Sequence, residues 1–318
     1  KARGYRELEL LSSINPVSSI VPSSSLTIGT FDGMHIGHNY LIREMLGFSK
    51  DNNLPSVVVT FSPNPFIVLN NLNKSQYHLM NRRQKYSSLE SMGVDYVYEL
   101  EFDKEMSEMG AEDFLRKYIL SPFNPNHITI GYDHHFGRGR EGDSHFLASH
   151  KDKNNYTLNV VDAYKLDDET VSSSLIRSLI KDGSVATASK YLGYNYEISG
   201  EVVKGNSVGR EIGFPTANID IDALEQLIPK NGVYFIKAKI NEDNYSGMCN
   251  IGHRPTVSDE NMTSLEVHIF NYANFDLYNQ IINIEFVDYV RNEIKFENIE
   301  DLKLQLIKDK EYCEDLQF

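Results

Sequence analysis

The stretch SLTIGTFDGMHIGH (25–38) joins a short apolar run to a glycine-rich loop that leads into an amphipathic segment. Leu26–Ile28 is a short apolar run within SLTIG (25–29), and apolar residues recur at helical spacing after the loop, at Tyr40, Leu41, Met45 and Leu46. A strand, a tight loop and a helix in this order predict one βα unit of a parallel sheet.

The same pattern continues through the first half of the chain. Four more apolar runs, mostly separated by longer polar segments, follow at VVVTF (57–61), YVYEL (96–100), HITIG (127–131) and LNVVD (158–162). Runs with little alternation indicate strands that are covered on both faces. Residues 1–185 are therefore predicted to form an α/β doubly wound domain, whose ligands should collect at the carboxyl ends of the strands.

The second half has many strand-like segments and little helix between them. These segments are YEISGEVVKG (196–205), VYFIKAKIN (233–241), YSGMCNIG (245–252), SLEVHIFN (264–271) and IINIEFVDYV (281–290). They predict a small antiparallel β-barrel over 186–318. The chain should end in a helix from Asn298 to about Asp309, with Asn298 as its N-cap. Residues 183–195 should form a short, ordered junction.

Composition and charge limit the classes of protein to which this chain can belong. The 318 residues include 31 Lys plus Arg and 45 Asp plus Glu, which gives a net charge of −14 and argues against a nucleic-acid partner. Cys249 and Cys313 have no metal or redox spacing, so a reduced, cytoplasmic protein is expected. No apolar run has the length of a membrane span, and KARGYRELELL is too charged for a secretory signal. We expect no membrane partner, and weak self-association stays open.

The loop after the first strand has the features of a phosphate site. Gly29, Gly33 and Gly37 allow tight turns and close approach of a ligand. His38 falls near the first turn of the next helix, where unpaired N–H groups favour an anion, and His35 lies three residues before it. The alternative is a surface loop with two incidental histidines, but its position directly after a strand favours a site.

Three further stretches carry polar groups at predicted strand ends or at a helix start. They are TFSPNPF (60–66), the loop GYDHHFGRGREGD (131–143) with Asp133, and VSSSLIRSLI (171–180) with Ser173, Ser174 and Arg177. Hydroxyls and an arginine at a helix N-terminus suit a triphosphate. An ordinary serine N-cap would explain the last stretch equally well if it stood alone.

With these motifs the chain resembles the bacterial bifunctional riboflavin kinase/FAD synthetase family over nearly its full length. The family patterns GxFDGxHxGH, TFxPHP, DFxFG and SSTxIR read here GTFDGMHIGH, TFSPNP, DHHFG and SSSLIR. Asn64 stands where the family has the PHP histidine, and His134 where it has a phenylalanine. The resemblance implies that His35 and His38 bind the ATP phosphates and that Asn64 contacts the flavin. The implied ATP site also contains Gly29, Phe31, Asp32, Gly33, Gly37, Asp133, Ser173, Ser174 and Arg177.

A second site is expected in GREIGFPTANI (209–219). The side-chain oxygens of Thr216 and Asn218 are suitable hard ligands for Mg²⁺ on ATP, although a plain Gly/Pro turn would have the same composition. The string matches the family's riboflavin kinase motif, which implies ATP contacts from Gly213, Pro215, Thr216 and Asn218.

The resemblance also implies the remaining residues of the kinase site. Glu266, in SLEVHIF, would be the general base for the riboflavin hydroxyl, although a lone strand glutamate is usually a solvated residue. Arg210 and Arg291 would contact the flavin.

The leading hypothesis is a two-domain flavin enzyme. It would phosphorylate riboflavin to FMN in the barrel and adenylylate FMN to FAD in the first domain, with ATP and Mg²⁺ in both steps. Alternatives are a paralogue that retains one transfer and a flavin- or nucleotide-binding regulator without turnover. A tRNA-charging enzyme is disfavoured by the acidic charge.

Overall fold

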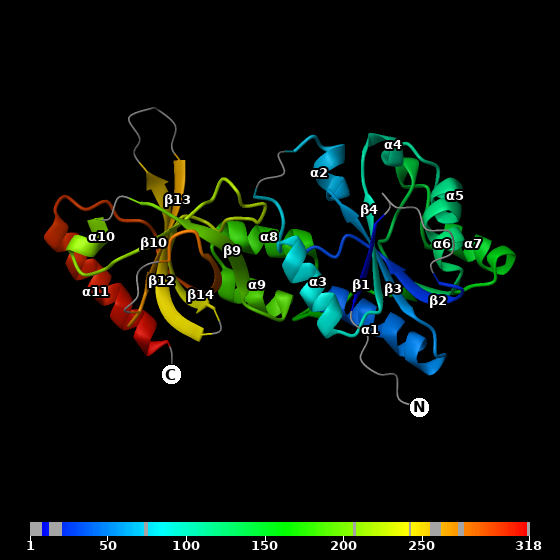
Figure 1. The fold of residues 1–318 in the computed structure, drawn as a ribbon, viewed down its shortest axis with the longest axis horizontal. Helices are drawn as coiled ribbons and strands as arrows, with labels where there is room; N and C mark the ends of the chain where they lie inside the picture. Colours follow the sequence, from blue (N-terminus) through cyan, green and yellow to red (C-terminus); the bar gives the residue numbers. More distant parts are fainter. Residues whose placement is uncertain are drawn as a thin grey trace. The chain divides into compact units, whose positions relative to one another are not determined.

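The computed structural model describes residues 8–12, 21–72, 76–205, 208–241, 243–254, 262–272 and 277–316. The chain forms two compact units, which are described separately (Figure 1). The first contains Lys1–Lys74 and Arg82–Val171, and the second contains Ser75–Asn81 and Ser172–Phe318.

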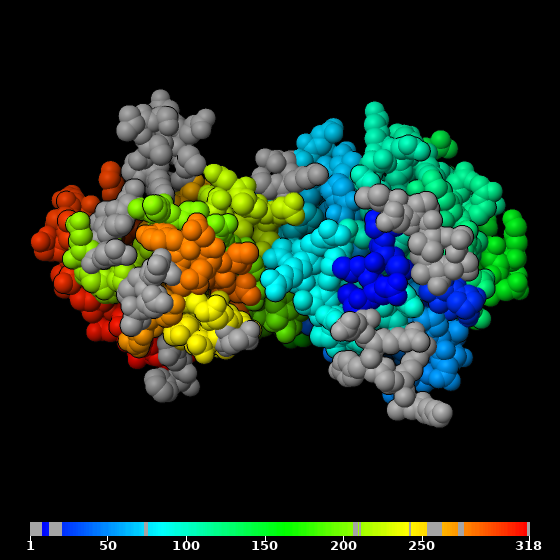
Figure 2. Space-filling model, viewed as in Figure 1, coloured from blue at the N-terminus to red at the C-terminus, as the bar shows by residue number. Residues whose placement is uncertain are grey.

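The first unit is built on a six-stranded parallel sheet with the strand order β1-β4-β3-β2-β5-β6. Its strands are β1 (Glu9–Ser12), β2 (Ser24–Ile28), β3 (Ser56–Ser62), β4 (Tyr96–Glu101), β5 (Pro125–Gly131) and β6 (Thr157–Val161). Five of them confirm the apolar runs. The edge strand β1 was not predicted, because it is short and partly exposed; Figure 2 shows it at the surface in dark blue.

Helices cover both faces of this sheet, as the doubly wound prediction requires. They are α1 (Ile36–Asp51), α2 (Pro65–Leu69), α3 (Arg82–Ser91), α4 (Lys104–Ser107), α5 (Ala111–Phe114), a π-helical segment (Leu115–Leu120), α6 (Ser121–Phe123), a 3₁₀ turn (Arg138–Arg140) and α7 (Ser144–Asn154). The short strands β7 (Lys165–Leu166) and β8 (Glu169–Thr170) pair with each other.

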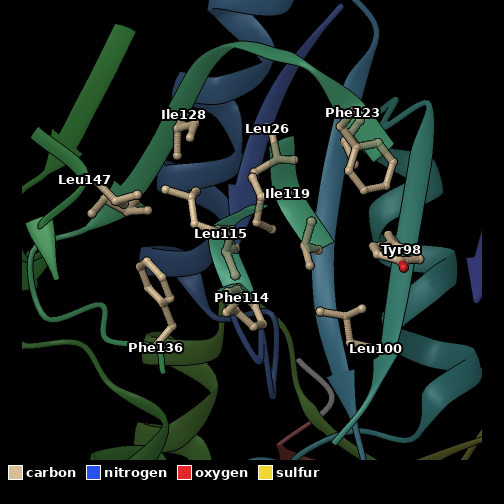
Figure 3. Packing of buried hydrophobic residues seen from close by; sticks show 14 of the residues in the cluster. Leu26, Tyr98, Leu100, Phe114, Leu115, Ile119, Phe123, Ile128, Phe136 and Leu147 are labelled. Atoms are coloured by element: carbon tan, nitrogen blue, oxygen red, sulfur yellow. The ribbon is translucent and has the colours of Figure 1, made fainter. Parts of the chain in front are cut away.

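The main core lies on one face of the sheet. Figure 3 shows Leu26 of β2 and Ile128 of β5 in one buried cluster with Leu115 and Ile119 of the segment that follows α5. The neighbouring Ser25 points to the opposite face, where its hydroxyl donates to the carbonyl of Met45 in α1 at 3.0 Å. Alternation along β2 thus places α1 and the α5–α6 region on opposite faces.

The order of the strands creates a topological switch point between β2 and β5. From β2 the chain passes to β3 and β4 on one side, and later to β5 and β6 on the other. Such a reversal leaves a crevice at the carboxyl ends of the two central strands. The loops that start at Gly29 and Tyr132 lie at these strand ends.

The second unit is a closed six-stranded barrel in which all neighbouring strands are antiparallel. Around the barrel the strands are β10 (Ala217–Ile219), β13 (Met262–Ile269), β12 (Asp243–Arg254), β11 (Gly232–Ile240), β14 (Ile281–Arg291) and β9 (Tyr196–Val203). Five strands confirm the prediction. The sixth, β10, was not predicted, because it is a three-residue strand inside the motif GREIGFPTANI.

Helices complete the second unit. They are α8 (Ser173–Asp182), α9 (Val185–Leu192), α10 (Val208–Glu211) and α11 (Ile299–Asp315). Asn298 caps α11, as predicted, and its side-chain oxygen accepts from the backbone N–H of Asp301 at 2.8 Å. The helix is longer than expected, and the junction 183–195 is itself mostly the helix α9. The domain boundary at 185/186 stays a prediction.

A short segment from the first half of the sequence also belongs to the second unit. The backbone N–H groups of Gln76 and Tyr77 donate to the carbonyls of Leu224 and Glu225, at 3.3 and 2.9 Å. The N–H of Leu227 in turn donates to His78 at 2.8 Å. These backbone bonds explain why Ser75–Asn81 groups with the barrel.

Candidate active sites

His35 and His38 form a stacked pair at the start of α1. His35 is the N-cap, and its Nδ1 accepts from the backbone N–H of His38 at 3.2 Å. The two rings lie 3.6 Å apart at 14°. Because Nδ1 of His35 is an acceptor, the proton of the neutral ring resides on Nε2, which can donate to a ligand. The prediction that both histidines belong to one helix start is confirmed.

The loop before this pair is shaped by Phe31. Its ring is 2% exposed, lies edge-on to His38 at 5.4 Å and leaves no room for a side chain at Gly29, where a Cβ would lie 2.9 Å from it. Phe31 itself has a φ of 47°, an uncommon value for a bulky residue that a functional loop can require. Asp32 is also buried. The loop is therefore a fixed turn.

Two neighbouring strand ends add polar groups from the predicted motifs. After β3, Asn64 is buried and caps α2, with its side-chain oxygen accepting from the N–H of Phe66 at 2.9 Å. After β5, Asp133 is exposed, whereas burial lowers the pKa of His134 to about 4. The structure gives Asn64 a capping role, and its contact with a flavin stays a prediction.

Sequence reasoning missed Lys85, which lies on α3 beneath the same loop. Its ammonium donates to the carbonyl oxygen of Thr30 at 3.0 Å and to the hydroxyl of Thr60 at 3.5 Å. No spacing signal could reveal this residue, because α3 is distant from the loop in sequence and carries two other cationic side chains.

The serines of VSSSLIR begin α8 in the second unit. The N-cap is Ser172, whose hydroxyl accepts from the N–H of Leu175 at 3.2 Å, so Ser173 and Ser174 occupy the first turn instead. Arg177 lies over the ring of Tyr77 at 4.2 Å and donates from Nε to the Tyr77 carbonyl at 3.2 Å. The serine-cap alternative thus applies to Ser172, and the triphosphate role of the other residues stays a prediction.

The barrel brings together the residues of the second motif. The hydroxyl of Thr216 donates to Oε2 of Glu266 at 3.3 Å, and Asn218 pairs directly with Glu266 across β10 and β13. Gly205 leaves the space that the Asn218 side chain fills, because a Cβ there would lie 2.0 Å from its amide nitrogen. Two neighbouring residues of the motif, Thr216 and Asn218, therefore meet Glu266 from a strand that is distant in sequence.

The loop that precedes β10 is held in place by His268, which sequence reasoning also missed. Its Nδ1 donates to the carbonyl of Pro215 at 2.8 Å, and burial lowers the pKa of the ring. Gly213 has a φ of 86°, and the N–H of Phe214 donates to Gly209 at 2.8 Å. The side chain of Arg210 lies outside the described residues.

A pocket that is partly open to solvent lies over these residues. Its lining consists of Val202, Gly205, Pro215, Thr216, Ala217, Asn218, Val267, Ile269, Leu277 and Tyr278. The pocket combines an apolar wall with the polar groups of Thr216 and Asn218, which is the usual composition of a small-molecule site.

The oxygen donors at this pocket fit a magnesium ion. A hydroxyl, an amide oxygen and a nearby carboxylate are hard ligands of the kind that Mg²⁺ takes together with phosphate oxygens. Thr216, Asn218 and Glu266 supply these groups. Within the described residues, no group of three or more His, Cys, Asp and Glu side chains forms a separate metal site.

Arg291 is engaged with the terminal helix. Its Nε and Nη2 donate to the carboxylate of Asp309, with the shortest distance 2.6 Å, and Nη1 donates to the carbonyl of Asn292 at 2.9 Å. Asp309 is 2% exposed. The pair joins β14 to α11, and the predicted contact of Arg291 with a flavin stays a prediction.

Comparisons with known proteins agree with the two units. The sequence model of the FAD synthetase family matches residues 18–175, and that of the riboflavin kinase family matches residues 192–317. No helix among the described residues combines the length and apolar character that a membrane span needs.

The relatives match over most of both chains. A bifunctional riboflavin kinase/FMN adenylyltransferase of Listeria monocytogenes is 33% identical, with 90% of each chain covered. The Escherichia coli protein of the same name is 35% identical, again with 90% of each chain covered. A crystal structure from Streptococcus pneumoniae, named as a macrolide-efflux protein, has a TM-score of 0.87 at 30% identity and covers 96% of this chain and 98% of its own. The chain thus belongs to the bifunctional riboflavin kinase/FMN adenylyltransferase family.

Proposed function

We propose that this protein makes FAD from riboflavin in two steps, each in one of its units. The barrel transfers the γ-phosphoryl group of ATP to riboflavin, which gives FMN and ADP. The first unit transfers the adenylyl group of a second ATP to FMN, which gives FAD and pyrophosphate. The observation that carries the proposal is the convergence of Thr216, Asn218 and Glu266 beside one pocket.

In the kinase step Glu266 is the general base. Its carboxylate takes the proton of the riboflavin 5′-hydroxyl while the oxygen attacks the γ-phosphorus, and ADP leaves. Thr216 and Asn218 hold Mg²⁺, which neutralises phosphate charge and orients the ATP. Pro215, held by His268, fixes the loop next to Thr216. Gly213 belongs to the same ATP-binding loop, and Arg210 and Arg291 contact the flavin.

In the adenylyl step the chain binds and orients its substrates. A phosphate oxygen of FMN attacks the α-phosphorus of ATP, and the bond to pyrophosphate breaks. The histidine pair at the start of α1 donates to the phosphate oxygens and stabilises charge on the leaving group. We assign the remaining ATP contacts within the first unit to Gly29, Phe31, Asp32, Gly33, Gly37 and Asp133, and a flavin contact to Asn64.

The setting of the reaction follows from the chemistry. The substrates are small molecules, so neither nucleic acid nor a membrane takes part. Both cysteines are buried and unbonded, which suits a reducing compartment, and we infer that the enzyme acts in the cytoplasm.

Chromatography of the reaction products tests the proposal. One reaction starts from riboflavin, ATP and Mg²⁺, and a parallel reaction starts from FMN. FMN followed by FAD in the first reaction, and FAD in the second, are expected. FMN without FAD would restrict the activity to the barrel. FAD from FMN, with none of the riboflavin converted, would restrict it to the first unit. If neither reaction gave a product, the protein would be a flavin- or nucleotide-binding protein without turnover.

A further inference from the structure

Lys85 places a cation directly behind the phosphate loop of the first unit. The carbonyl oxygen of Thr30 accepts from the Lys85 ammonium at 3.0 Å and from the hydroxyl of Thr60 at 3.2 Å. Thr60 belongs to the end of β3, and Thr30 lies directly after Gly29 in the loop. One carbonyl therefore ties together the loop, the end of β3 and helix α3.

The surroundings compensate the charge of this ammonium only in part. Both of its hydrogen-bond acceptors, Thr30 and Thr60, are neutral. The charged groups that face it are Asp32 from the loop, Glu99 from β4 and Arg82 from α3. Glu99 is itself paired with the guanidinium of Arg82 at 2.6 Å and accepts from the hydroxyl of Tyr86.

We propose that Lys85 is a positioning residue for adenylyl transfer, which fixes the Thr30–Asp32 turn and supplies positive charge behind the bound triphosphate. The inference rests on the proposed adenylyl transfer at this loop. It adds a cation to the ATP site that comes from α3, outside all of the motifs that point to that site.

Burial gives this role a dependence on pH. Desolvation is the main cause that lowers the pKa of Lys85 below its ordinary value of 10.5, and Asp32 and Glu99 oppose it in part. A triphosphate at the loop would stabilise the ammonium and raise that pKa again. Above the pKa of the free enzyme, ATP binding must therefore take up a proton, so the affinity for ATP falls as the pH rises.

The test measures KM for ATP in FAD formation from FMN between about pH 7.5 and 9.5. For the wild-type protein the KM should rise across this range. Lys85→Met should give a KM at least about tenfold higher, which corresponds to about 1.4 kcal/mol, and that KM should no longer change with pH, since both the positive charge and the hydrogen bond to Thr30 are lost. Lys85→Arg should restore a low KM that is also independent of pH, because a guanidinium stays charged.

Two controls isolate the effect. Arg83→Gln removes a charge from the exposed neighbour of Lys85 on α3 and should keep the wild-type profile. The KM for ATP in riboflavin phosphorylation is measured on the same protein samples and should be equal in all variants. Its dependence on pH shows any general effect of pH on ATP itself. Thermal unfolding of each variant detects any loss of folding.

The possible results distinguish a failure of the proposed adenylyl transfer from a failure of the role of Lys85 alone. A wild-type protein that forms no FAD from FMN overturns both the proposed adenylyl transfer and the role of Lys85. FAD formation in which Lys85→Met keeps the wild-type KM and pH profile overturns the role of Lys85 alone. An equal loss in Lys85→Met and Lys85→Arg, with unchanged stability, would also contradict a role based on positive charge.

Discussion

Thr216 and Glu266 meet across 3.3 Å, with the hydroxyl of the first donating to the carboxylate of the second. A proton acceptor thus lies next to a group suited to hold Mg²⁺ and ATP phosphate, at the edge of a pocket. This is the arrangement that a small-molecule kinase needs, because the nucleophile must lose its proton where it meets the γ-phosphate.

Replacing Glu266 by glutamine should separate the two activities. The amide keeps the size of the side chain and can still accept from Thr216, but it cannot act as a base. We expect kcat for FMN formation to fall by roughly 10²- to 10⁴-fold. FAD formation from added FMN should be unchanged. A loss of less than about tenfold in the kinase reaction would contradict the role of Glu266 as general base.

Gly205→Ala should impair the kinase through Asn218. The new Cβ would lie 2.0 Å from the Asn218 amide, so this side chain must move away from its place beside Glu266. Activity assays at increasing Mg²⁺ should show a higher concentration for half-maximal FMN formation. Gly47→Ala is the matched control, because nothing lies within 4 Å of its Cβ. That variant should be up to about 1 kcal/mol more stable, since alanine favours a helix. An unchanged Mg²⁺ requirement in Gly205→Ala would exclude this role of Asn218.

The two histidines of the first unit should respond differently to substitution. His38→Ala removes a ligand contact but leaves the cap of α1, so FAD formation should be lost with little change in stability. His35→Ala removes the cap as well and should cost about 1 kcal/mol of unfolding free energy. His35→Asn should recover that stability without recovering FAD formation. Product chromatography and chemical unfolding measure the two effects, and riboflavin phosphorylation should stay unchanged in all three variants. Normal FAD formation by His38→Ala would contradict the proposed site.

Strong local patterns made most of the fold predictable. Buried parallel strands appear as continuous apolar runs, and all five such runs are strands. The missed strands of the parallel sheet and of the barrel, β1 and β10, are three or four residues long, and their pairing depends on partners that are distant in sequence. Their formation is a tertiary effect that no local window contains.

The residues of the candidate sites also fall into two groups, those that the sequence predicts and those that it does not. Residues inside motifs, such as His38 and Glu266, could be named from the sequence. Lys85 and His268 could not, because each acts on the backbone of a motif from a different element, through the carbonyls of Thr30 and Pro215. Supporting contacts of this kind depend on where the chain folds back, and they leave no periodic signal.

The ion pair between Arg291 and Asp309 should stabilise the second unit. Asparagine at position 309 leaves the largely buried guanidinium without its counter-charge, and breaking such a pair costs roughly 3 kcal/mol or more. Urea unfolding of Asp309→Asn should show this loss. Glu314→Gln on the same helix should cost less than about 0.5 kcal/mol, because its pair with Lys310 is longer and more exposed. Equal stability of both variants would mean that the buried pair contributes no more than a surface pair.

Acid should destabilise the first unit through two histidines that are neutral when folded. Burial lowers the pKa of His127 and of His134 from 6.5 to about 4. Between these values the unfolded chain binds protons that the folded chain does not, so stability falls as the pH drops from 6.5 to 4. His134→Phe should flatten this dependence, and at neutral pH it should be neutral or stabilising, because the structure describes no hydrogen-bond partner for the buried Nε2. Urea unfolding at pH 7 and pH 5 measures both effects. If the loss between the two pH values were the same in His134→Phe as in the wild type, His134 would not be one of the groups responsible.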